Sequence, residues 1–342
     1  MAALKAVMTA TGWDEPLALQ PDTPGEPGPG QVRVRVEACG VCGRDLIDRA
    51  GRFPFLKLPV VPGHEVSGVV EAVGDDVSAW SVGDRVATLH RDHCGACAPC
   101  ERGDESLCEA ASWVFGLMVD GGYAQTLIAP DSALYGLPPI DKLSAAEAAI
   151  FHCTFGTAWR SLVRVGELKD GEKVVITGAN GGVGAAAVQV ARRRGAQVVA
   201  VVRREGHAQF LHDLGAHDVV VAPDGRFHRR PEAAGADIVL ECVGPGTFRS
   251  SLGCLRLGGR LLVVGNVDGG RAEINLGAVV VRGLKVMGPG GATSADMRLL
   301  LSEHGWSPWS FPAQEILPLE EADAAQRRVR QGGLSGRLVL TP

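Results

Sequence analysis

The sequence has no surplus of positive charge, no long hydrophobic run and no secretion signal. Its 34 Lys and Arg residues against 39 Asp and Glu give a formal net charge of -5, so it lacks the basic footprint of a nucleic-acid-binding protein. No apolar run approaches the roughly 18 residues of a membrane-spanning helix. Residues 1–10 lack a charged start followed by an apolar stretch and a cleavage site. We therefore expect a soluble, cytoplasmic protein.

Internal repeats and low-complexity tracts are also absent. The 46 Gly and 20 Pro residues are many for 342 positions, yet too few for a collagen-like or disordered chain. With 46% hydrophobic and 21% charged residues, the chain can bury sizeable cores, and its length predicts two domains. Nine cysteines without a secretion signal indicate thiolate chemistry or metal binding rather than disulfides.

The first 150 residues read mainly as β-structure. Residues 31–36 alternate polar and apolar side chains with the period of a half-buried strand. Residues 66–73 and 84–89 look similar and are separated by Gly-Asp turn signals. Short strands punctuated by Gly and Pro favour a small barrel or sandwich.

Beyond about residue 155, buried strands alternate with helices. The apolar run 173–177 is followed by a glycine cluster at 178–184 and a helix at 183–194, which together begin a βαβ unit. We expect further strands at 197–202, 218–221, 237–241, 260–264 and 284–287, further helices at 207–214 and 247–257, and a last strand at 336–340. This alternation predicts a parallel sheet with helices on both faces.

Four closely spaced cysteines, Cys94, Cys97, Cys100 and Cys108, form a C-x2-C-x2-C-x7-C pattern. Each C-x2-C step aims two sulfurs at one point, so four thiolates can surround one tetrahedral Zn²⁺. Free or disulfide-linked thiols are the alternative. A closed shell of four sulfurs leaves no position for a substrate, so we interpret this zinc as structural.

Three further candidate ligands are Cys42, His64 and Cys153, far apart in the sequence. Taken singly, a cysteine or histidine is more often a packing residue than a ligand. Together with Asp45, Glu65, the four-cysteine lobe and the glycine cluster, however, their order resembles that of the zinc-containing medium-chain dehydrogenases. The resemblance covers essentially the whole chain.

This resemblance implies a catalytic zinc ion bound by Cys42, His64 and Cys153. Asp45 and Glu65 would support these ligands or exchange as one. Three protein ligands leave an open position at which zinc acts as a Lewis acid, and a carboxylate beside the histidine fixes its tautomer. The neighbouring Cys39 and His152 are expected to be structural.

The resemblance also implies an α/β fold with two parts. A GroES-like, β-rich catalytic domain would comprise residues 1–154 and 291–342, and a Rossmann domain with a doubly wound parallel sheet would comprise residues 155–290. The active site would lie in the cleft between them.

The glycine cluster stands between a predicted strand and a predicted helix. Glycines there allow a tight turn and a close approach to a pyrophosphate at the helix N-terminus. The spacing is similar to that of NADPH-dependent reductases of the superfamily. The candidate cofactor-binding residues of this loop are Gly178, Asn180, Gly181, Gly182, Val183 and Gly184, and by resemblance Thr157, Gly265 and Asn266 would flank the nicotinamide.

The end of the second predicted parallel strand bears on the choice between NAD and NADP. An acidic residue usually stands there to bind the ribose hydroxyls of NAD. This sequence instead has Arg203 and Arg204, with no acid before Glu205. Two guanidinium groups suit a 2′-phosphate, although a solvated pair on a surface turn is the alternative. We therefore favour NADP(H) over NAD(H).

Position 44 departs from the alcohol dehydrogenases, which carry Ser or Thr two residues after the first cysteine ligand to relay the alcohol proton. Here the residue is Arg44, which cannot act as a base near neutral pH. A guanidinium about 5 Å from Zn²⁺ would be repelled by roughly 6–7 kcal/mol at an effective dielectric of 20. Arg44 is therefore expected to point away from the metal, toward an acid or a phosphate, unless zinc occupancy is low. The alternative is an outward-facing surface arginine, with another group as the proton relay.

This departure favours a reaction that needs no alcohol proton relay. The chain resembles the archaeal acryloyl-CoA reductase branch in four segments: the sequence around Arg44, the glycine loop, residues 265–268 and residues 290–296. That resemblance implies NADPH-dependent reduction of a short or branched enoyl-CoA, with zinc stabilising the developing enolate. The alternatives are a zinc-dependent alcohol or aldehyde dehydrogenase and a zinc-stabilised nucleotide-binding or redox-sensing protein without turnover.

The expected partners are small molecules, with an acyl-CoA thioester as substrate. Relatives of this length pair their Rossmann domains edge to edge, which implies a homodimer or homotetramer formed through the strand near residues 284–287. No nucleic-acid or membrane partner is expected.

Overall fold

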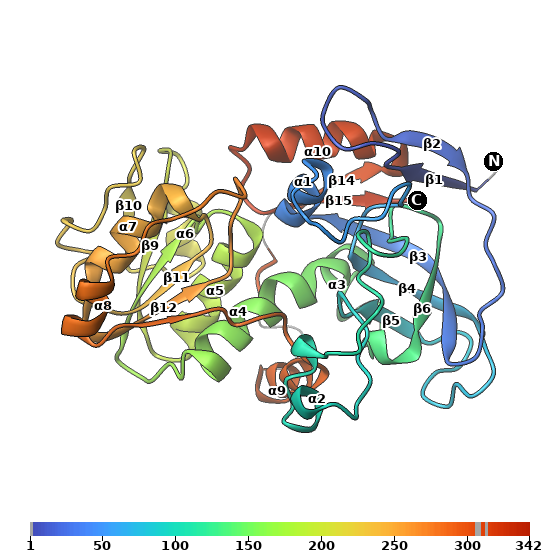
Figure 1. Ribbon diagram of the computed structural model, residues 1–342, viewed down its shortest axis with the longest axis horizontal. Helices are drawn as coiled ribbons and strands as arrows, with labels where there is room; N and C mark the ends of the chain where they lie inside the picture. The colour runs from blue at the N-terminus through green and yellow to red at the C-terminus, as the bar shows by residue number, and fades with distance from the viewer. Residues whose placement is uncertain (1–2, 305–308, 312–313) are drawn as a thin grey trace.

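The computed structural model describes residues 3–304, 309–311 and 314–342. Two large sheets dominate it, one on each side of the molecule (Figure 1). A separate two-stranded antiparallel sheet pairs β1 (Leu4–Val7) with β2 (Ala18–Pro21). None of the helices in the described part of the chain is both long and apolar enough to cross a bilayer.

The first large sheet is mainly antiparallel and has the order β14-β15-β3-β4-β5-β7, with β6 paired to β3. In β3, Val32, Val34 and Val36 are buried and alternate with more exposed polar residues, as the sequence predicts. The strands are β3 (Gln31–Val41), β4 (Glu65–Val73), β5 (Arg85–Thr88), β6 (Thr126–Pro130), β7 (Leu134–Gly136), β14 (Gln314–Pro318) and β15 (Arg337–Thr341). This is a GroES-like sheet, and its last two strands come from the end of the chain.

The second sheet is parallel, with the order β10-β9-β8-β11-β12-β13. Its strands are β8 (Lys173–Thr177), β9 (Gln197–Val202), β10 (Asp218–Val221), β11 (Ala236–Glu241), β12 (Leu255–Val263) and β13 (Lys285–Met287). The connecting helices are α5 (Gly182–Arg193), α6 (Ala208–Asp213), α7 (Pro245–Cys254) and α8 (Leu276–Arg282). The order reverses between β8 and β11, and ligands of such Rossmann-type sheets bind at the carboxyl ends of the strands beside this point.

A continuous helical segment connects the two sheets. It comprises α3 (Ala145–Phe151), a π-helical turn at His152–Gly156, α4 (Thr157–Trp159) and a second π-helical stretch at Arg160–Val165. The α3 end packs on β3 and β4, and the α4 end packs on α5. Figure 1 shows α3 and α4 between the two sheets. Cys153 therefore lies where the antiparallel and parallel parts meet.

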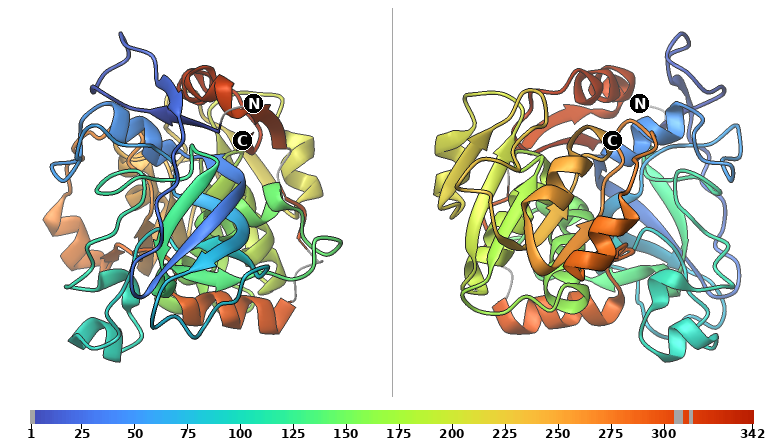
Figure 2. Two further views of the ribbon diagram at one scale, coloured as in Figure 1. Left: turned by 90° about the vertical axis from the view of Figure 1, so that its right-hand side faces the viewer. Right: turned by 60° about the vertical axis from the view of Figure 1, so that its left-hand side comes forward.

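The remaining helices lie at the periphery. They are α1 (Gly43–Arg49), α2 (Ala98–Glu101), α9 (Ser294–His304) and α10 (Ala322–Gln331). Helix α10 covers β14 and β15 and also contacts α1. All three views in Figures 1 and 2 place α9 beside the segment that contains α2, and the backbone N–H of Ser294 donates to Glu105 in that segment.

Two sequence predictions about the parallel sheet were wrong at one boundary. The helix predicted at 247–257 ends at Cys254, and the strand predicted to begin at residue 260 begins at Leu255. Leu255 is buried and pairs with Ala236, so sheet pairing takes precedence over helical periodicity at this position. The positive φ of Gly258 accommodates an irregularity within β12.

Candidate active site and metal centres

Cys42 lies at the start of α1, directly after β3. Its backbone is extended, and its N–H donates to Asp45 Oδ2 at 2.9 Å. This bond closes the first turn of the helix and fixes the direction of the thiol. The side chain of Cys42 is buried, so its sulfur lies inside the protein rather than at the surface of α1.

His64 is oriented by a buried chain of polar groups. Its Nδ1 lies 3.2 Å from Asp45 Oδ1, and the Tyr123 hydroxyl donates to Asp45 Oδ2 at 3.0 Å. Gly63 has φ of +96°, and a Cβ there would lie 2.5 Å from the Tyr123 ring, so only glycine allows this close packing. The arrangement leaves Nε2 of His64 free to bind a metal.

Cys153 completes a cluster with Cys42, His64 and Glu65. The two sulfurs are 3.9 Å apart, and Cys153 Sγ lies 3.8 Å from His64 Nε2. One ligand atom from each of the four residues lies within 4.8 Å of the others. Zn–S bonds of about 2.3 Å in a tetrahedron place two sulfurs about 3.8 Å apart. The donor set and its spacing therefore fit a catalytic zinc ion.

Arg337, which was not among the residues predicted from the sequence, also lies in this cluster. Its Nη2 donates to Glu65 Oε1 at 2.7 Å and lies 3.4 Å from Cys42 Sγ and 3.8 Å from Cys153 Sγ. Its Nε is buried and has no hydrogen-bond partner in the described part of the chain, and a Cβ on Gly182 would lie 2.6 Å from it. Arg337 thus spans from the metal cluster to the start of α5. An arginine opening the otherwise apolar strand 337–341 was the one available sequence signal.

The charges around the cluster favour a bound cation. The hydrogen bond with Cys153 holds the pKa of Cys42 well below its ordinary value, against the effect of burial. Burial raises the pKa of Glu65 to about 7, although Arg337 opposes this rise. Burial and Arg44 disfavour protonation of His64, but Cys42 and Asp45 outweigh them and raise its pKa to about 9. Removing these groups from water is costly without a compensating charge, which a divalent ion would supply.

Arg44 follows Cys42 by two residues and is turned toward an acid. Its Nε donates to Asp48 Oδ2 at 3.1 Å, one helical turn along α1, and its Nη2 donates to the Phe115 carbonyl. The guanidinium that lies closest to the sulfurs of the cluster belongs to Arg337 rather than to Arg44.

The four-cysteine lobe forms a second candidate metal centre. The ligand atoms of Cys94, Cys97, Cys100 and Cys108 all lie within 4.8 Å of one another. The sulfurs of Cys97 and Cys100 are 3.4 Å apart, and those of Cys97 and Cys108 are 3.8 Å apart. The sulfurs of Cys108 and Cys94 are 3.6 Å apart. These values fit a tetrahedral structural zinc site. The adjoining Asp104 accepts from Arg160 at 2.8 Å, so the lobe is tied to the helical segment that carries Cys153.

The glycine loop connects β8 to α5. Gly178 has φ of +56°, and a Cβ on Gly184 would lie 2.4 Å from the Gly178 carbonyl oxygen. Both positions therefore require glycine, and Val183 lies in the first turn of α5. Asn180 donates to the Leu334 carbonyl at 2.8 Å and accepts from Gly336 N at 2.9 Å. The loop is thereby joined to the segment that leads into Arg337.

Glu241, at the carboxyl end of β11, organises the neighbouring loop. Its buried carboxylate accepts hydrogen bonds from the hydroxyls of Thr177, Thr247 and Ser251 and from the backbone N–H groups of Val243 and Gly244. The following strand ends against this loop, because a Cβ on Gly265 would lie 2.0 Å from the Cys242 carbonyl oxygen. Asn266 comes next and donates to the Gly270 carbonyl.

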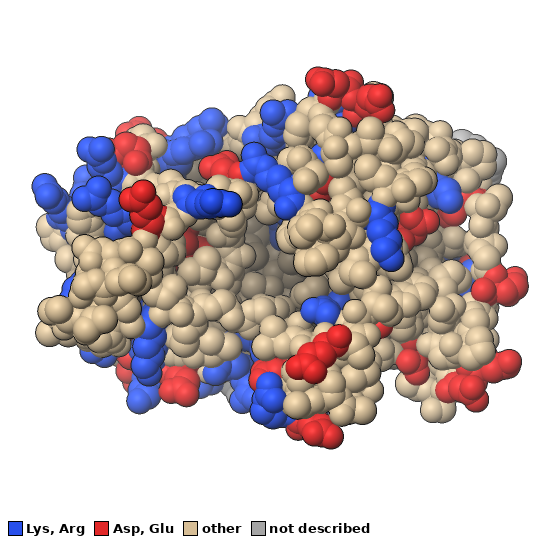
Figure 3. Space-filling model, in the orientation of Figure 1, with Lys and Arg blue, Asp and Glu red and all other residues tan. Residues whose placement is uncertain are grey.

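Thr157, the remaining cofactor candidate, begins α4 one turn after Cys153. Its carbonyl accepts a hydrogen bond from Ser161. The space-filling view shows the surface hollowed between the two halves of the molecule (Figure 3). This hollow lies between the antiparallel and parallel sheets, as expected for a cofactor and substrate cleft.

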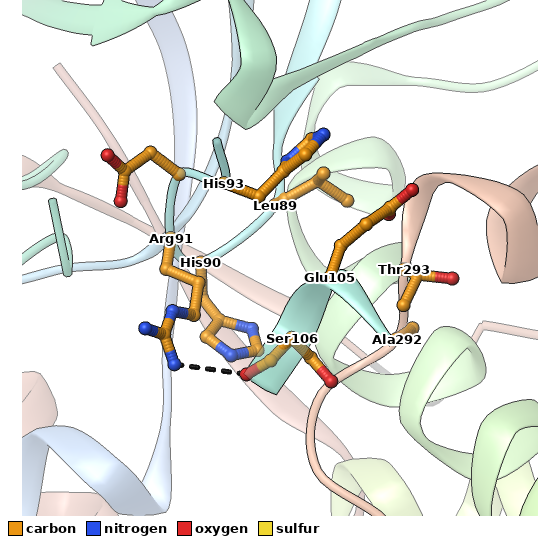
Figure 4. Close-up of a pocket in the computed structure, with 9 residues that line it drawn as sticks. Leu89, His90, Arg91, His93, Glu105, Ser106, Ala292 and Thr293 are labelled. Carbon is orange, nitrogen blue, oxygen red and sulfur yellow. Dashed lines mark hydrogen bonds between the residues drawn. The ribbon is translucent and has the colours of Figure 1, made fainter. Parts of the chain in front are cut away.

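A small pocket adjoins the four-cysteine lobe. It is lined by residues 89–93, Glu105, Ser106, Ala292 and Thr293, and Figure 4 shows Glu105 and Ser106 facing Ala292 and Thr293 across it. Arg91 donates to the Ser106 carbonyl. The pocket has room for about one water molecule, so it is too small for a cofactor or substrate.

Known families match both halves of the chain. Residues 28–139 match the alcohol dehydrogenase GroES-like domain, and residues 182–304 match the zinc-binding dehydrogenase family. An acryloyl-coenzyme A reductase of Sulfurisphaera tokodaii is 31% identical over 93% of this chain and 94% of its own length. An alcohol dehydrogenase of Geobacillus stearothermophilus is 36% identical over 91% of this chain and 92% of its own length.

Solved structures match the whole chain as well. The crystal structure of AibC has a TM-score of 0.87 and 39% identity, covering 100% of this chain and 96% of that chain. A cobalt- and zinc-bound alcohol dehydrogenase from Pyrobaculum aerophilum has a TM-score of 0.89 and 30% identity, with full coverage of both chains.

Proposed function

Because the chain belongs to the zinc-containing medium-chain dehydrogenase and reductase family, and is therefore an NAD(P)-dependent oxidoreductase, we propose that it reduces the conjugated double bond of short or branched enoyl-CoA thioesters with NADPH. The observation that carries this choice is Arg44, which stands where alcohol dehydrogenases have a proton-relaying hydroxyl. Similarity to two acryloyl-CoA reductases along nearly the whole chain supports it.

NADPH bound in the cleft would supply a hydride to the β-carbon, and the double-bond electrons would move to the thioester oxygen. A proton from water would then add to the α-carbon. The products would be NADP⁺ and the saturated thioester. A zinc ion held by Cys42, His64 and Cys153 would act as a Lewis acid toward that oxygen. Asp45 and Tyr123 would fix the His64 tautomer from behind.

Arg337 would couple the cofactor site to the metal site. It holds Glu65 by a buried ion pair, while its unpartnered Nε faces the first residue of α5, beside the expected pyrophosphate position. A guanidinium suits a phosphate oxygen at that place. We infer that Arg337 prevents Glu65 from binding the metal and that its Nε donates a hydrogen bond to the pyrophosphate.

Initial rates with NADPH on a panel of enoyl-CoA thioesters and a panel of aldehydes test the proposed function. Enoyl-CoA reduction with little aldehyde turnover is expected. Robust aldehyde reduction without enoyl-CoA activity would instead establish the second candidate, a zinc-dependent alcohol or aldehyde dehydrogenase. That candidate is favoured by the similarity to the alcohol dehydrogenase of Geobacillus stearothermophilus.

A preference for NADPH follows from Arg203 and Arg204, both exposed just after β9. A Cβ on Gly332 would lie 3.4 Å from the Arg203 guanidinium, and a Cβ on Gly333 would lie 2.9 Å from the Arg204 guanidinium. The two arginines therefore lie beside these glycines. We propose that both bind the 2′-phosphate. Replacing both by alanine should raise the Kd for NADPH about 30-fold or more and leave that for NADH within about twofold. Calorimetric titration measures both values.

The matched control for this pair is Arg226→Ala, because the Arg226 side chain is 82% exposed and is not one of the candidate cofactor-binding residues. Its affinity for NADPH should equal that of the wild type. Equal losses of NADPH and NADH affinity in the double variant would contradict the assignment and indicate damage to the loop instead.

We propose a homodimer joined along β13. This strand is an edge of the parallel sheet, and the adjacent α8 exposes Leu276, Val280 and Val281 at 70%, 78% and 83%. An unpaired strand edge beside exposed apolar side chains is a typical interface. Val281→Glu should halve the mass measured by light scattering, whereas Ile140→Glu, at an exposed position outside the parallel sheet, should leave it unchanged. A wild-type chain of monomeric mass would contradict this proposal.

A further inference from the structure

The Arg44–Asp48 pair is built unlike a surface ion pair. The Asp48 side chain is only 2% exposed and the Arg44 side chain 18%. The pair lies one helical turn apart on α1, whose first residue follows Cys42 directly. A buried carboxylate is expensive to keep charged, and burial raises the pKa of Asp48 to about 6 although Arg44 lowers it. Such a pair beside a candidate metal site suggests a functional constraint.

The hydrogen bonds of Arg44 leave one part of its guanidinium available. Nε is held by Asp48, and Nη2 is held by the Phe115 carbonyl. Nη1 has no hydrogen-bond partner among the described residues, and it is absent from the buried unpartnered atoms, so it is open to solvent.

The guanidinium also lies close to the histidine ligand. A Cβ added to Gly116 would lie 3.3 Å from Arg44 Nη2 and 2.7 Å from the backbone nitrogen of Gly63. Gly63 is the residue before His64, so the guanidinium lies near the backbone that carries this ligand. Arg44 is one of the main charges that disfavour protonation of His64. Two anchored nitrogens and one open nitrogen give a fixed cation at the edge of the metal cluster.

We propose that Arg44 is a specificity-determining residue that offers Nη1 to the thioester carbonyl oxygen of the substrate, and that Asp48 is the positioning residue that holds it there. This inference rests on the proposed function. Negative charge collects on that oxygen as the hydride adds to the β-carbon, so a fixed cation stabilises the transition state more than the ground state. An aldehyde gains less, because its alkoxide also needs a proton, which a guanidinium cannot relay.

Asp48 acts on Arg44 in two ways. It neutralises part of the guanidinium charge, which a divalent ion nearby would otherwise repel. It also prevents the side chain from swinging away from the cluster, together with the Phe115 carbonyl. The Asp48 side chain is only 2% exposed, so Asp48 itself is not placed to touch the substrate.

Steady-state kinetics of Arg44→Ser, Arg44→Lys and Asp48→Asn test this inference, with crotonyl-CoA and a short aldehyde as the two substrates. Arg44→Ser should lower kcat for the thioester about 100-fold with a smaller change in KM, and should raise aldehyde reduction about tenfold by restoring a hydroxyl. Arg44→Lys should recover part of the thioester activity, and Asp48→Asn should lose about tenfold. Kd for NADPH and the zinc content should stay at wild-type values, which separates this role from a structural one.

The outcomes distinguish this inference from the proposed function. If the wild type reduces crotonyl-CoA and Arg44→Ser reduces it equally fast, Arg44 is not the specificity determinant, although the proposed function stands. If the wild type reduces only the aldehyde, both are overturned together. Arg226→Ser serves as the control for loss of an arginine and should match the wild type with both substrates.

Discussion

Cys42→Ser is expected to lower the zinc content from two ions per chain to one and to reduce NADPH-dependent turnover by about a thousandfold or more. Cys42 supplies one of three donors that fix the ion, and its sulfur lies 3.9 Å from that of Cys153. A serine oxygen is a weaker and shorter ligand at that place. Losing a Lewis acid removes several kcal/mol of transition-state stabilisation. Atomic absorption on the dialysed protein gives the metal count.

Cys254→Ser is the matched control for this variant. Cys254 is buried and donates to the Ser251 carbonyl, a bond that serine can replace, and it lies outside both metal clusters. It should retain two zinc ions and full activity. A Cys42→Ser protein that also retained two ions would show that the first cluster does not depend on this thiol.

Cys108→Ser is expected to release the other zinc ion and to destabilise the protein strongly. Structural zinc contributes roughly 10–16 kcal/mol of apparent binding free energy in small peptides, and in this lobe all four candidate ligands lie within residues 94–108. We expect the Tm to fall by about 10 °C, which corresponds to roughly 3–5 kcal/mol for a domain of this size. Differential scanning calorimetry measures the shift.

The effect of Cys108→Ser should extend beyond the lobe. Arg160 bridges Asp104 of the lobe to Asp296 at 2.8 and 2.7 Å, and it lies two helical turns after Cys153. Hydrogen exchange should therefore rise in residues 152–165 as well as in residues 94–108. Faster exchange confined to the lobe would contradict this coupling.

The sequence predicts features that are local in the chain. The four-cysteine spacing and the glycine loop each lie within a short segment, so their chemistry is visible without knowing the fold. Strands β8, β9 and β10 begin and end at the predicted residues, because buried parallel strands read as continuous apolar runs. The three distant zinc ligands could be grouped only by resemblance, since no local pattern joins them.

Features that depend on packing were not predictable. Arg337 is 184 residues from Cys153 in the sequence, and it reaches the metal cluster only because β15 pairs with β3. Asp48 is buried in the folded chain, which no pattern of neighbouring residues in the sequence indicates. The end of α7 was misplaced because Leu255 joins the sheet, and helical and strand periodicities cannot be separated over three residues.

An anomalous difference map from crystals of the zinc-loaded protein, measured at the zinc absorption edge, tests the central claim most directly. We expect two peaks per chain: one among the four sulfurs of the lobe and one within bonding distance of Cys42 Sγ, His64 Nε2 and Cys153 Sγ. A single peak in the lobe, with the Arg337 guanidinium in the place of the second, would show that this chain has no metal at its reactive centre.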